Sequence, residues 1–507
     1  MFQLKMGERF RCNARAFSYS LYKGHPRRGK LQDKPIIIME LSAATLVSIA
    51  LISLAIVVFV LSNSSSSKQR RPPGPRCLPF IGSLLHLLTP EPQVALRDLA
   101  KKHGPVMYLR LGHIDTVVIS SPEAAQEVLR DSSLAFASRP SIVSTEIMCY
   151  GSTDIAFAPH GAYWRTLRKI CTVELLSPRK VKQFAPIRNS ETLSLEQFLS
   201  AMVVALEFSG GVCVGDLFPS LYFVDAVTGL RRRLWRARRN LDVVFGKIIE
   251  GCEARREEKK YKTGTASGDD DLLTLMLRIR DEGELEFPIT TENIKAIIVD
   301  LFTAGTETTS SSAEWLMSEL MRNPEVMVKA QAEVRRVFDN KPPQEHESLL
   351  EELPYMRMMV KEGMRLHPVL PLLLPRLCGE TCNVGGFEVA KGSRVMVNAW
   401  AIARSPDHWQ DADKFMPERF QDSTVDYKGT QYEFLPFGSG RRMCPGGNFG
   451  VAVLELIVAR LLYYFDWSLP SGMEPGDLNM DMIVSATSRR KNQLHLVALP
   501  RKVQMDT

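Results

Sequence analysis

The sequence predicts a mostly α-helical domain with small β-sheets, preceded by a single transmembrane helix. Three observations support this fold class. Most segments beyond residue 75 repeat their apolar residues at the period of a helix, HIDTVVIS at 113–120 has the composition of a strand, and residues 41–61 are apolar and uncharged. With 507 residues, 45% of them hydrophobic, the chain can build a sizeable core.

The N-terminal part divides into an extension, an anchor and a hinge. Leu41–Leu61 has 21 residues without a charge, which is the length of a bilayer-spanning helix and exceeds that of a secretory signal. We therefore expect a retained anchor at 39–62, a polar linker with the PPGP hinge at 63–75, and a catalytic domain at 76–507. Basic residues just after the anchor favour a cytosolic position for that domain.

Residues 1–38 carry the whole net charge of +7, because they hold nine Lys or Arg against two acidic residues. The remaining chain is neutral overall, which argues against a nucleic-acid partner. Two interpretations of the extension stay open. Met39 is the natural start, which we favour, or residues 1–38 are an Arg-rich, acid-poor targeting segment.

Several helices are predicted along the domain. Glu123–Leu129, Leu349–Leu366 and an apolar stretch at 451–465 have helical period, and the longest pattern runs from Thr291 to Arg322. The middle of this long helix, AGTETTSSS at 304–312, is rich in residues that disfavour a helix interior. Such a break indicates a functional site; a kinked packing helix is the alternative.

The nine cysteines are scattered, with one close pair at 378 and 382 and no C-x-x-C cluster, which disfavours a disulfide framework, structural zinc and iron–sulfur sites. One cysteine has an unusual setting, the loop PFGSGRRMCPG at 436–446. Its glycines permit tight turns, and its arginines and backbone N–H groups favour a thiolate at Cys444. The pattern therefore predicts a ligand or a nucleophile at this position.

Three further motifs are weak by themselves. GAYWRTLRK places Trp164 and Arg168 on one helical face, and KEGMRLHP does the same for Glu362 and Arg365. PERF at 417–420 adds Arg419. Each of these is more often a solvated surface than a site.

The order PPGP, WRTLRK, AGTETT, EGMR, PERF and PFGSGRRMCPG resembles the cytochrome P450 superfamily of haem-thiolate monooxygenases, in its membrane-anchored plant type. The resemblance covers nearly everything from Pro72 to Pro500, and longer stretches are similar to plant terpenoid oxidases. The cysteine loop matches F-x-x-G-x-R-x-C-x-G at Phe437, Gly440, Arg442, Cys444 and Gly446. The resemblance implies the cytochrome P450 fold, with a long central helix over the haem.

The resemblance also implies a cofactor, haem b (heme, iron protoporphyrin IX), with Cys444 as the axial ligand of its iron. Its propionates would be held by Arg442, Trp164, Arg168 and Arg376. Arg139 is a less certain fourth cation. Phe437, Gly440 and Gly446 would shape the loop so that the backbone approaches the sulfur and the porphyrin.

By the same resemblance, Glu307 and Thr308 are the acid–alcohol pair that delivers protons to the reacting oxygen. Glu362, Arg365 and Arg419 form a structural network below the cysteine loop. The substrate-lining segments lie at 141–155, 301–305, 369–375 and 483–486, and include Ala304, Leu301, Val369, Leu370, Leu373, Ile483 and Ser485. These residues are mostly apolar, as a hydrocarbon substrate requires.

The expected enzyme is an oxidoreductase that hydroxylates a small hydrophobic plant metabolite, a pimaradiene-like diterpene of phytoalexin biosynthesis. A sesquiterpenoid or other specialised-metabolite substrate is an alternative. Electrons would come from NADPH through a separate NADPH–cytochrome P450 reductase, because the chain has no flavin or dinucleotide motif. The expected location is the endoplasmic reticulum membrane, with a plastid as the alternative if residues 1–38 are a transit sequence.

The chain departs from the family pattern at one place. Between 187–195 and 196–211 about forty family residues are missing, a length that holds two or three helices. Their loss would reduce core burial, so a non-catalytic, poorly folding isoform is a further alternative.

Overall fold

The computed structural model describes residues 71–177, 213–263, 272–283, 286–485 and 487–501. The chain divides into two compact units, 1–65 and 66–507, and every described residue belongs to the second. The predicted extension, the anchor at Leu41–Leu61 and the junction at 195–196 lie outside the described residues. They therefore stay predictions.

Four small sheets form the β part of the described chain. The largest has the strand order β1-β2-β6-β3; β1 and β2 are antiparallel, β2 and β6 parallel, and β6 and β3 antiparallel. The other three are two-stranded and antiparallel: β4 with β5, β7 with β10, and β8 with β9. The strands are β1 Val106–Leu111, β2 Ile114–Ile119, β3 Arg376–Leu377, β4 Cys382–Val384, β5 Phe387–Val389, β6 Arg394–Val397, β7 Phe465–Ser468, β8 Met482–Val484, β9 Ser488–Arg490 and β10 Val497–Pro500.

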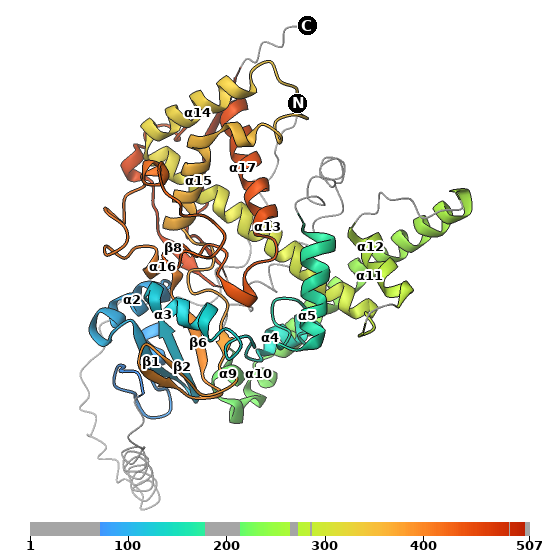
Figure 1. The fold of residues 1–507 in the computed structure, drawn as a ribbon, viewed down its shortest axis with the longest axis vertical. Helices are drawn as coiled ribbons and strands as arrows, with labels where there is room; N and C mark the ends of the chain where they lie inside the picture. The colour runs from blue at the N-terminus through green and yellow to red at the C-terminus, as the bar shows by residue number, and fades with distance from the viewer. Residues whose placement is uncertain (1–70, 178–212, 264–271, 284–285, 486, 502–507) are drawn as a thin grey trace, which may run out of the picture. The chain divides into compact units, whose positions relative to one another are not determined.

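Helices make up most of the rest (Figure 1). They are α2 Pro92–His103, α3 Pro122–Gln126, α4 Val143–Met148, α5 Ala162–Lys169, α9 Val214–Leu217, α10 Phe223–Val227, α11 Leu230–Thr263, α12 Leu272–Glu282, α13 Thr291–Arg322, α14 Pro324–Phe338, α15 Pro354–Leu366, α16 Ala399–Ile402 and α17 Gly447–Tyr464. This content confirms the predicted mostly α fold with small sheets.

Individual elements agree with the sequence to different degrees. The strand predicted at 113–120 is β2, and the long helix begins at Thr291 and ends at Arg322, as its pattern predicted. The predicted helix 123–129 is confirmed, since α3 continues as a π-helical turn at Glu127–Asp131. The helix predicted at 349–366 was too long, because α15 begins only at Pro354, where proline suits the first turn of a helix.

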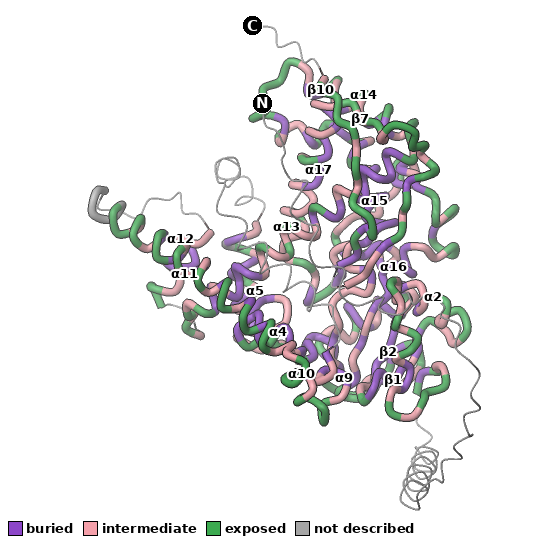
Figure 2. The backbone as a smooth tube through the Cα atoms, turned by 180° about the vertical axis from the view of Figure 1, so that it is seen from behind, coloured by how far each residue is buried: buried purple, intermediate pink, exposed green. Residues whose placement is uncertain are grey.

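Helix α13 is the central element of the domain (Figure 1). Thr290 and Asn293 form a capping box at its start, which satisfies backbone N–H groups that have no partner within the helix. Its first half packs into a core with α4, α5, α11 and α12, and its second half into a core with α14, α15 and α17. The stretch between these halves, around 302–308, is buried in neither core and consists of exposed and half-buried residues (Figure 2).

Among the described helices, α17 is the one that is long and apolar enough to cross a membrane. It packs against α13, α14 and α15, so its apolar surface belongs to the core of the domain. It therefore says nothing about the predicted anchor at Leu41–Leu61.

Candidate functional site

The cysteine loop is shaped by two left-handed glycines. Gly438 and Gly440 have φ values of +67° and +70°, which residues with a side chain rarely adopt. A Cβ at Gly440 would also lie 1.8 Å from the carbonyl oxygen of Leu129. The missing side chain of Gly440 therefore makes room for the π-helical turn at 127–131.

Cys444 lies just before α17. Its backbone N–H donates to the carbonyl oxygen of Phe437 at 3.0 Å, which closes the loop. The side chain is exposed to solvent, yet burial among the surrounding protein atoms raises the pKa of the thiol.

The predicted bias of Cys444 toward thiolate is wrong for the protein alone. The N–H group of Gly446 and the charge of Arg168 lower the pKa of the thiol, but burial outweighs both. A coordinated metal ion deprotonates a cysteine outright, so ligation, and not the arginines of the loop, would supply the thiolate.

Three buried guanidinium groups lie together near the loop: those of Arg139, Arg376 and Arg442. Their N–H groups donate to backbone carbonyl oxygens. Arg442 reaches Ala137, Ile155 and Ala158, Arg139 reaches Ala156, Leu374 and Pro375, and Arg376 reaches Phe136 and Ser439. Within the described part of the chain, none of the three forms an ion pair with a carboxylate.

The charges in this arginine cluster are only partly compensated, because Asp154 attracts Arg139 and Arg442 without forming an ion pair with them. Burial lowers the pKa of Arg442 to about 9 and that of Arg376 to about 10, and burial together with repulsion from the other two lowers the pKa of Arg139 well below its ordinary value. Buried charges are normally paired, so the cluster requires an anion. The two propionates of haem b are such anions, and Cys444 is the soft ligand that its iron takes in this family; the residues present therefore fit the cofactor.

Helix α5 brings Trp164 and Arg168 to the same place. The Trp164 ring lies under the Arg442 guanidinium at 4.1 Å, and its Nε1–H donates to the carbonyl oxygen of Ile155 at 2.9 Å. The pKa of Arg168 is lowered by burial and raised by the nearby Cys444 thiol. Arg168 thus lies between the arginine cluster and the cysteine.

The acid–alcohol pair lies in the stretch of α13 between the two cores. Thr308 donates its hydroxyl hydrogen to the carbonyl oxygen of Ala304 at 2.5 Å, so the lone pairs of its Oγ1 are left to accept another proton donor. Ala304 lies one helical turn before Thr308, on the same face of α13, and is exposed. The small side chain therefore leaves space beside the Thr308 hydroxyl.

The side chain of Glu307 has a partner that sequence reasoning missed. Thr487, which lies between strands β8 and β9, donates its hydroxyl hydrogen to Oε1 of Glu307 at 3.2 Å. The two residues are 180 positions apart, so no spacing rule could have joined them. Thr487 fixes where the Glu307 carboxylate points.

The predicted substrate segments come from distant parts of the chain. The N–H of Ser488 donates to the carbonyl oxygen of Val369 at 2.7 Å, which joins the β8–β9 turn to the segment 369–375, and β9 lies against α13. The apolar candidates on these segments are half-buried: Leu301, Val369, Leu370, Leu373 and Ile483, with Ser485 beside them. The fourth segment, 141–155, contains helix α4.

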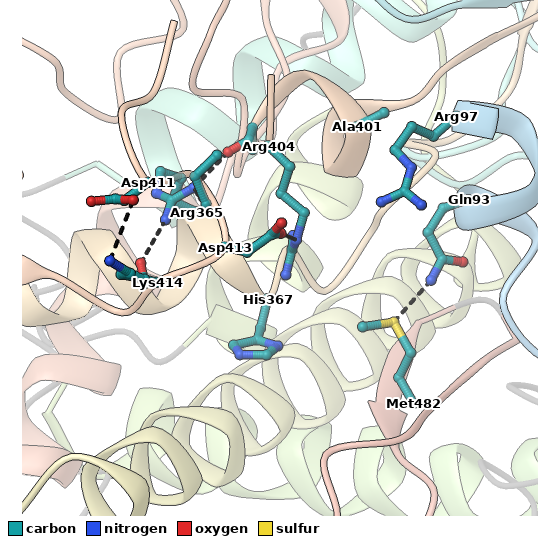
Figure 3. A network of polar contacts seen from close by, with 12 residues as sticks. Gln93, Arg97, Arg365, His367, Ala401, Arg404, Asp411, Asp413, Lys414 and Met482 are labelled. Atoms are coloured by element: carbon teal, nitrogen blue, oxygen red, sulfur yellow. Dashed lines mark hydrogen bonds and ion pairs between the residues drawn. The ribbon is translucent and has the colours of Figure 1, made fainter. Parts of the chain in front are cut away.

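Glu362, Arg365 and Arg419 form a buried ionic network. Arg365 holds both oxygens of Glu362, at 2.7 and 2.9 Å, and Arg419 Nε donates to Oε1 at 2.9 Å. Arg365 also donates to the carbonyl oxygens of Ala403 and Lys414, and Lys414 pairs with Asp411 (Figure 3). The network ties α15 to the chain around 403–419 and takes no part in the arginine cluster.

Comparison with protein families gives one match. The family model of cytochrome P450 matches residues 72–205 and 202–496, in two pieces that meet near residue 205. A zebra fish cytochrome P450 structure with abiraterone is similar over 81% of this chain and 99% of that chain, with a TM-score of 0.64 and 26% identity.

Plant relatives are closer in sequence. Cytochrome P450 99A2 of Oryza sativa subsp. japonica is 58% identical over 93% of this chain and 96% of its own, and 9-beta-pimara-7,15-diene oxidase of the same plant is 57% identical over 91% and 98%. Premnaspirodiene oxygenase of Hyoscyamus muticus is 44% identical over 86% and 94%. Together with the cysteine loop and the long central helix, these similarities show that the chain belongs to the cytochrome P450 family of monooxygenases.

Proposed function

We propose that the chain binds haem b through Cys444 and the arginine cluster and oxidises a terpenoid, a diterpene hydrocarbon of the pimaradiene class. The observation that carries the proposal is the buried arginine cluster, which forms no ion pair with a carboxylate of the described residues, together with the exposed Cys444, whose thiol acts on the neighbouring Arg168. The test is to express the full chain and record its haem content and its reduced carbon monoxide spectrum. A thiolate-type Soret band supports the proposal, and a chain that takes up no haem contradicts it.

When bound, the haem would supply the activation of dioxygen. The residues of this chain have separate tasks around it. The sulfur of Cys444 would ligate the iron, while Arg139, Arg376, Arg442, Arg168 and Trp164 would hold the propionates. Thr308 Oγ1 would accept a hydrogen bond close to the reacting oxygen. Glu307, held by Thr487, would pass protons from solvent to that oxygen.

The substrate class has separate support. The lining candidates are apolar and half-buried, as a hydrocarbon substrate requires, and a relative that is 57% identical is named as a pimaradiene oxidase. A sesquiterpene is the alternative, supported by the premnaspirodiene oxygenase at 44% identity. Spectral titration of the purified chain with diterpene and sesquiterpene hydrocarbons, followed by product analysis, distinguishes the two.

We further propose a single-pass anchor at Leu41–Leu61 in the endoplasmic reticulum membrane, with NADPH–cytochrome P450 reductase as the electron donor. In the described residues, exposed apolar side chains gather just after the hinge and on α10: Leu78, Phe80, Leu85, Leu88, Leu221, Tyr222, Phe223 and Val227. Such a surface suits contact with the lipid next to the anchor. A reporter fused after Thr507 should be cytosolic at the endoplasmic reticulum, whereas import into a plastid would support a transit sequence at 1–38.

The alternative to an active enzyme is a non-catalytic isoform that folds poorly. The alignment with the pimaradiene oxidase extends over 503 positions but covers 91% of this 507-residue chain, so about forty of its positions have no counterpart here. The family model also matches in two pieces that meet at 202–205. Both observations support a missing segment near 195–196, and the haem content of the expressed chain decides between the two functions.

A further inference from the structure

A short segment, Asp154–Ala158, is held by the central helix from one side. Asp300 of α13 accepts two backbone N–H groups with its Oδ2, from Ile155 at 2.9 Å and from Ala156 at 3.1 Å. A carboxylate that accepts two adjacent N–H groups fixes both the position and the orientation of the peptide units that carry them.

The carbonyl oxygens of the same segment hold the arginine cluster. Ile155 accepts Arg442 Nη1 at 3.3 Å, and Ala158 accepts Arg442 Nη2 at 2.5 Å. Ala156 accepts Arg139 Nε at 3.0 Å. The segment therefore connects the carboxylate of α13 to the guanidinium groups, with its N–H groups on one side and its carbonyl groups on the other.

A second carboxyl group completes this connection. Asp154 is fully buried, its Oδ1 accepts the N–H of Phe157 at 3.3 Å, and a carboxyl oxygen of Asp154 lies within 4.8 Å of one of Asp300. Its Oδ2 has no N–H or O–H donor among the described residues. Two buried carboxylates in contact repel each other, and a single shared proton removes the repulsion and supplies the missing donor.

Electrostatics agree with a shared proton. Burial raises the pKa of Asp154 to about 6, and burial together with the charge of Asp154 raises the pKa of Asp300 well above its ordinary value. The pair titrates as a unit. The charged and titratable groups that face it are Cys149, Tyr163, Cys171, Arg139, Arg238 and Arg442.

A divalent cation is the competing occupant. Ligand atoms of Cys149, Asp154 and Asp300 lie within 4.8 Å of one another, which a metal ion could bridge. However, the charges of Arg139 and Arg442 act on Asp154, and they oppose a further double positive charge at this place. A single proton removes the repulsion between the two carboxylates and adds only one positive charge, whereas a divalent cation would add two.

We propose that Asp154 and Asp300 share one proton, and that Asp300 is a positioning residue that orients the propionate-binding arginines Arg139 and Arg442 through the segment 154–158. This inference rests on the proposed binding of haem b. It assigns to α13 a second task beside the acid–alcohol pair, because the same helix that carries Thr308 would also set the cations at the edge of the cofactor.

The shared proton has a consequence for stability. A carboxyl whose pKa is raised by folding contributes stability that is fully present below its unfolded pKa of about 3.9 and is lost as the pH rises through its folded pKa. The first such step lies near pH 6, where the pair passes from two protons to the single shared proton, and the shared proton itself is lost only at the higher pKa of Asp300. The unfolding midpoint of the chain should therefore fall as the pH rises through this range.

The experiment compares the full chain with D300N, D300A and the matched control E333A. An asparagine keeps an oxygen for the two N–H groups and donates permanently to Asp154, whereas alanine does neither. Glu333 of α14 also accepts two backbone N–H groups, from Tyr355 and Met356, but in a core away from the arginine cluster. Unfolding midpoints are measured between about pH 4 and 8, and haem loss is timed with a haem-scavenging apoglobin.

We expect the pH slope of the midpoint to flatten in D300N, and haem loss to become about tenfold faster in D300A, as for one charge-assisted hydrogen bond. D300N should retain haem like the unchanged chain, and E333A should lower the midpoint without either effect. An equal pH slope in D300N, or unchanged haem loss in D300A, overturns the inference. A midpoint raised by zinc in the unchanged chain, but not in D300N, would show a cation site and overturn proton sharing.

Failure of the proposed function gives a different result. A chain that takes up no haem in any variant overturns haem binding and, with it, the task assigned to Asp300 toward the arginines. The pH slope is measured on the protein itself and still decides whether the two carboxyl groups share a proton.

Discussion

Thr487 donates its hydroxyl hydrogen to Oε1 of Glu307 at 3.2 Å, across 180 residues of sequence. The hydroxyl is buried, and the carboxylate belongs to the proposed acid–alcohol pair of α13. The β8–β9 turn, which carries substrate-lining candidates, is thereby joined directly to the proposed proton path.

We expect T487V to release the Glu307 carboxylate and impair proton delivery, while haem content stays unchanged. Valine has the shape of threonine but cannot donate a hydrogen bond. Loss of one hydrogen bond to a charged group changes the equilibrium between the held and the released carboxylate by about tenfold. The measurement is hydrogen peroxide released per NADPH oxidised, which should rise in T487V. T487S restores the hydroxyl and should behave like the unchanged chain; if both variants release equal peroxide, Thr487 does not orient Glu307.

T308A should bind haem but divert electrons to peroxide. The substitution removes the hydroxyl that would accept a hydrogen bond from the proton-donating group. S310A is the matched control, since Ser310 makes a similar hydroxyl-to-carbonyl bond in the same helix, to Thr306 at 2.8 Å. The ratio of product to NADPH consumed is compared in both. Equal coupling in T308A and S310A would remove Thr308 from the proton path.

C444A should abolish the thiolate-type carbon monoxide spectrum, because the only thiol in the loop is lost. C77A is a suitable control, since Cys77 is also exposed but lies outside the loop. Both proteins are compared by haem content and reduced carbon monoxide spectrum at equal concentration. A normal spectrum in C444A would rule out this cysteine as the iron ligand.

E362A should destabilise the domain by about 3–5 kcal/mol, because it leaves the fully buried guanidinium of Arg365 without its carboxylate. E418A is the neighbouring control, since Glu418 pairs with the exposed Lys329 and its loss should change stability little. Urea unfolding of the two variants measures the difference. Similar midpoints would mean that the network contributes no more than a surface pair.

Insertion of the corresponding residues of 9-beta-pimara-7,15-diene oxidase at the Leu195–Glu196 junction should raise haem content and the unfolding midpoint. Two or three missing helices would remove more stabilisation than the roughly 5–15 kcal/mol by which domains are stable. An insertion of equal length made of Gly and Ser provides the control. Equal haem content in all three proteins would show that the shortened chain folds without the segment.

Local patterns in the sequence predicted much of the fold. The bounds of α13, the strand at 113–120 and the helix after the cysteine loop follow from apolar period and from the residues at their ends, and each depends on neighbours a few positions away. The helix predicted at 349–366 was too long, because an apolar period does not show that α15 begins only at Pro354; nor does it show that the helix at 123–129 changes from α to π at Glu127.

The sequence by itself determined the family, the cysteine ligand candidate and the residue types that a haem site needs, because these reside in short contiguous motifs. Only the tertiary structure decided how those residues act together. It placed Thr487 on Glu307, gave the donors of Arg442 to backbone carbonyl groups, and brought Asp154 against Asp300. The physical reason is that hydrogen bonds and desolvation depend on which distant segments pack against each other, and burial among those segments raised the pKa of the Cys444 thiol where the loop alone predicted a thiolate.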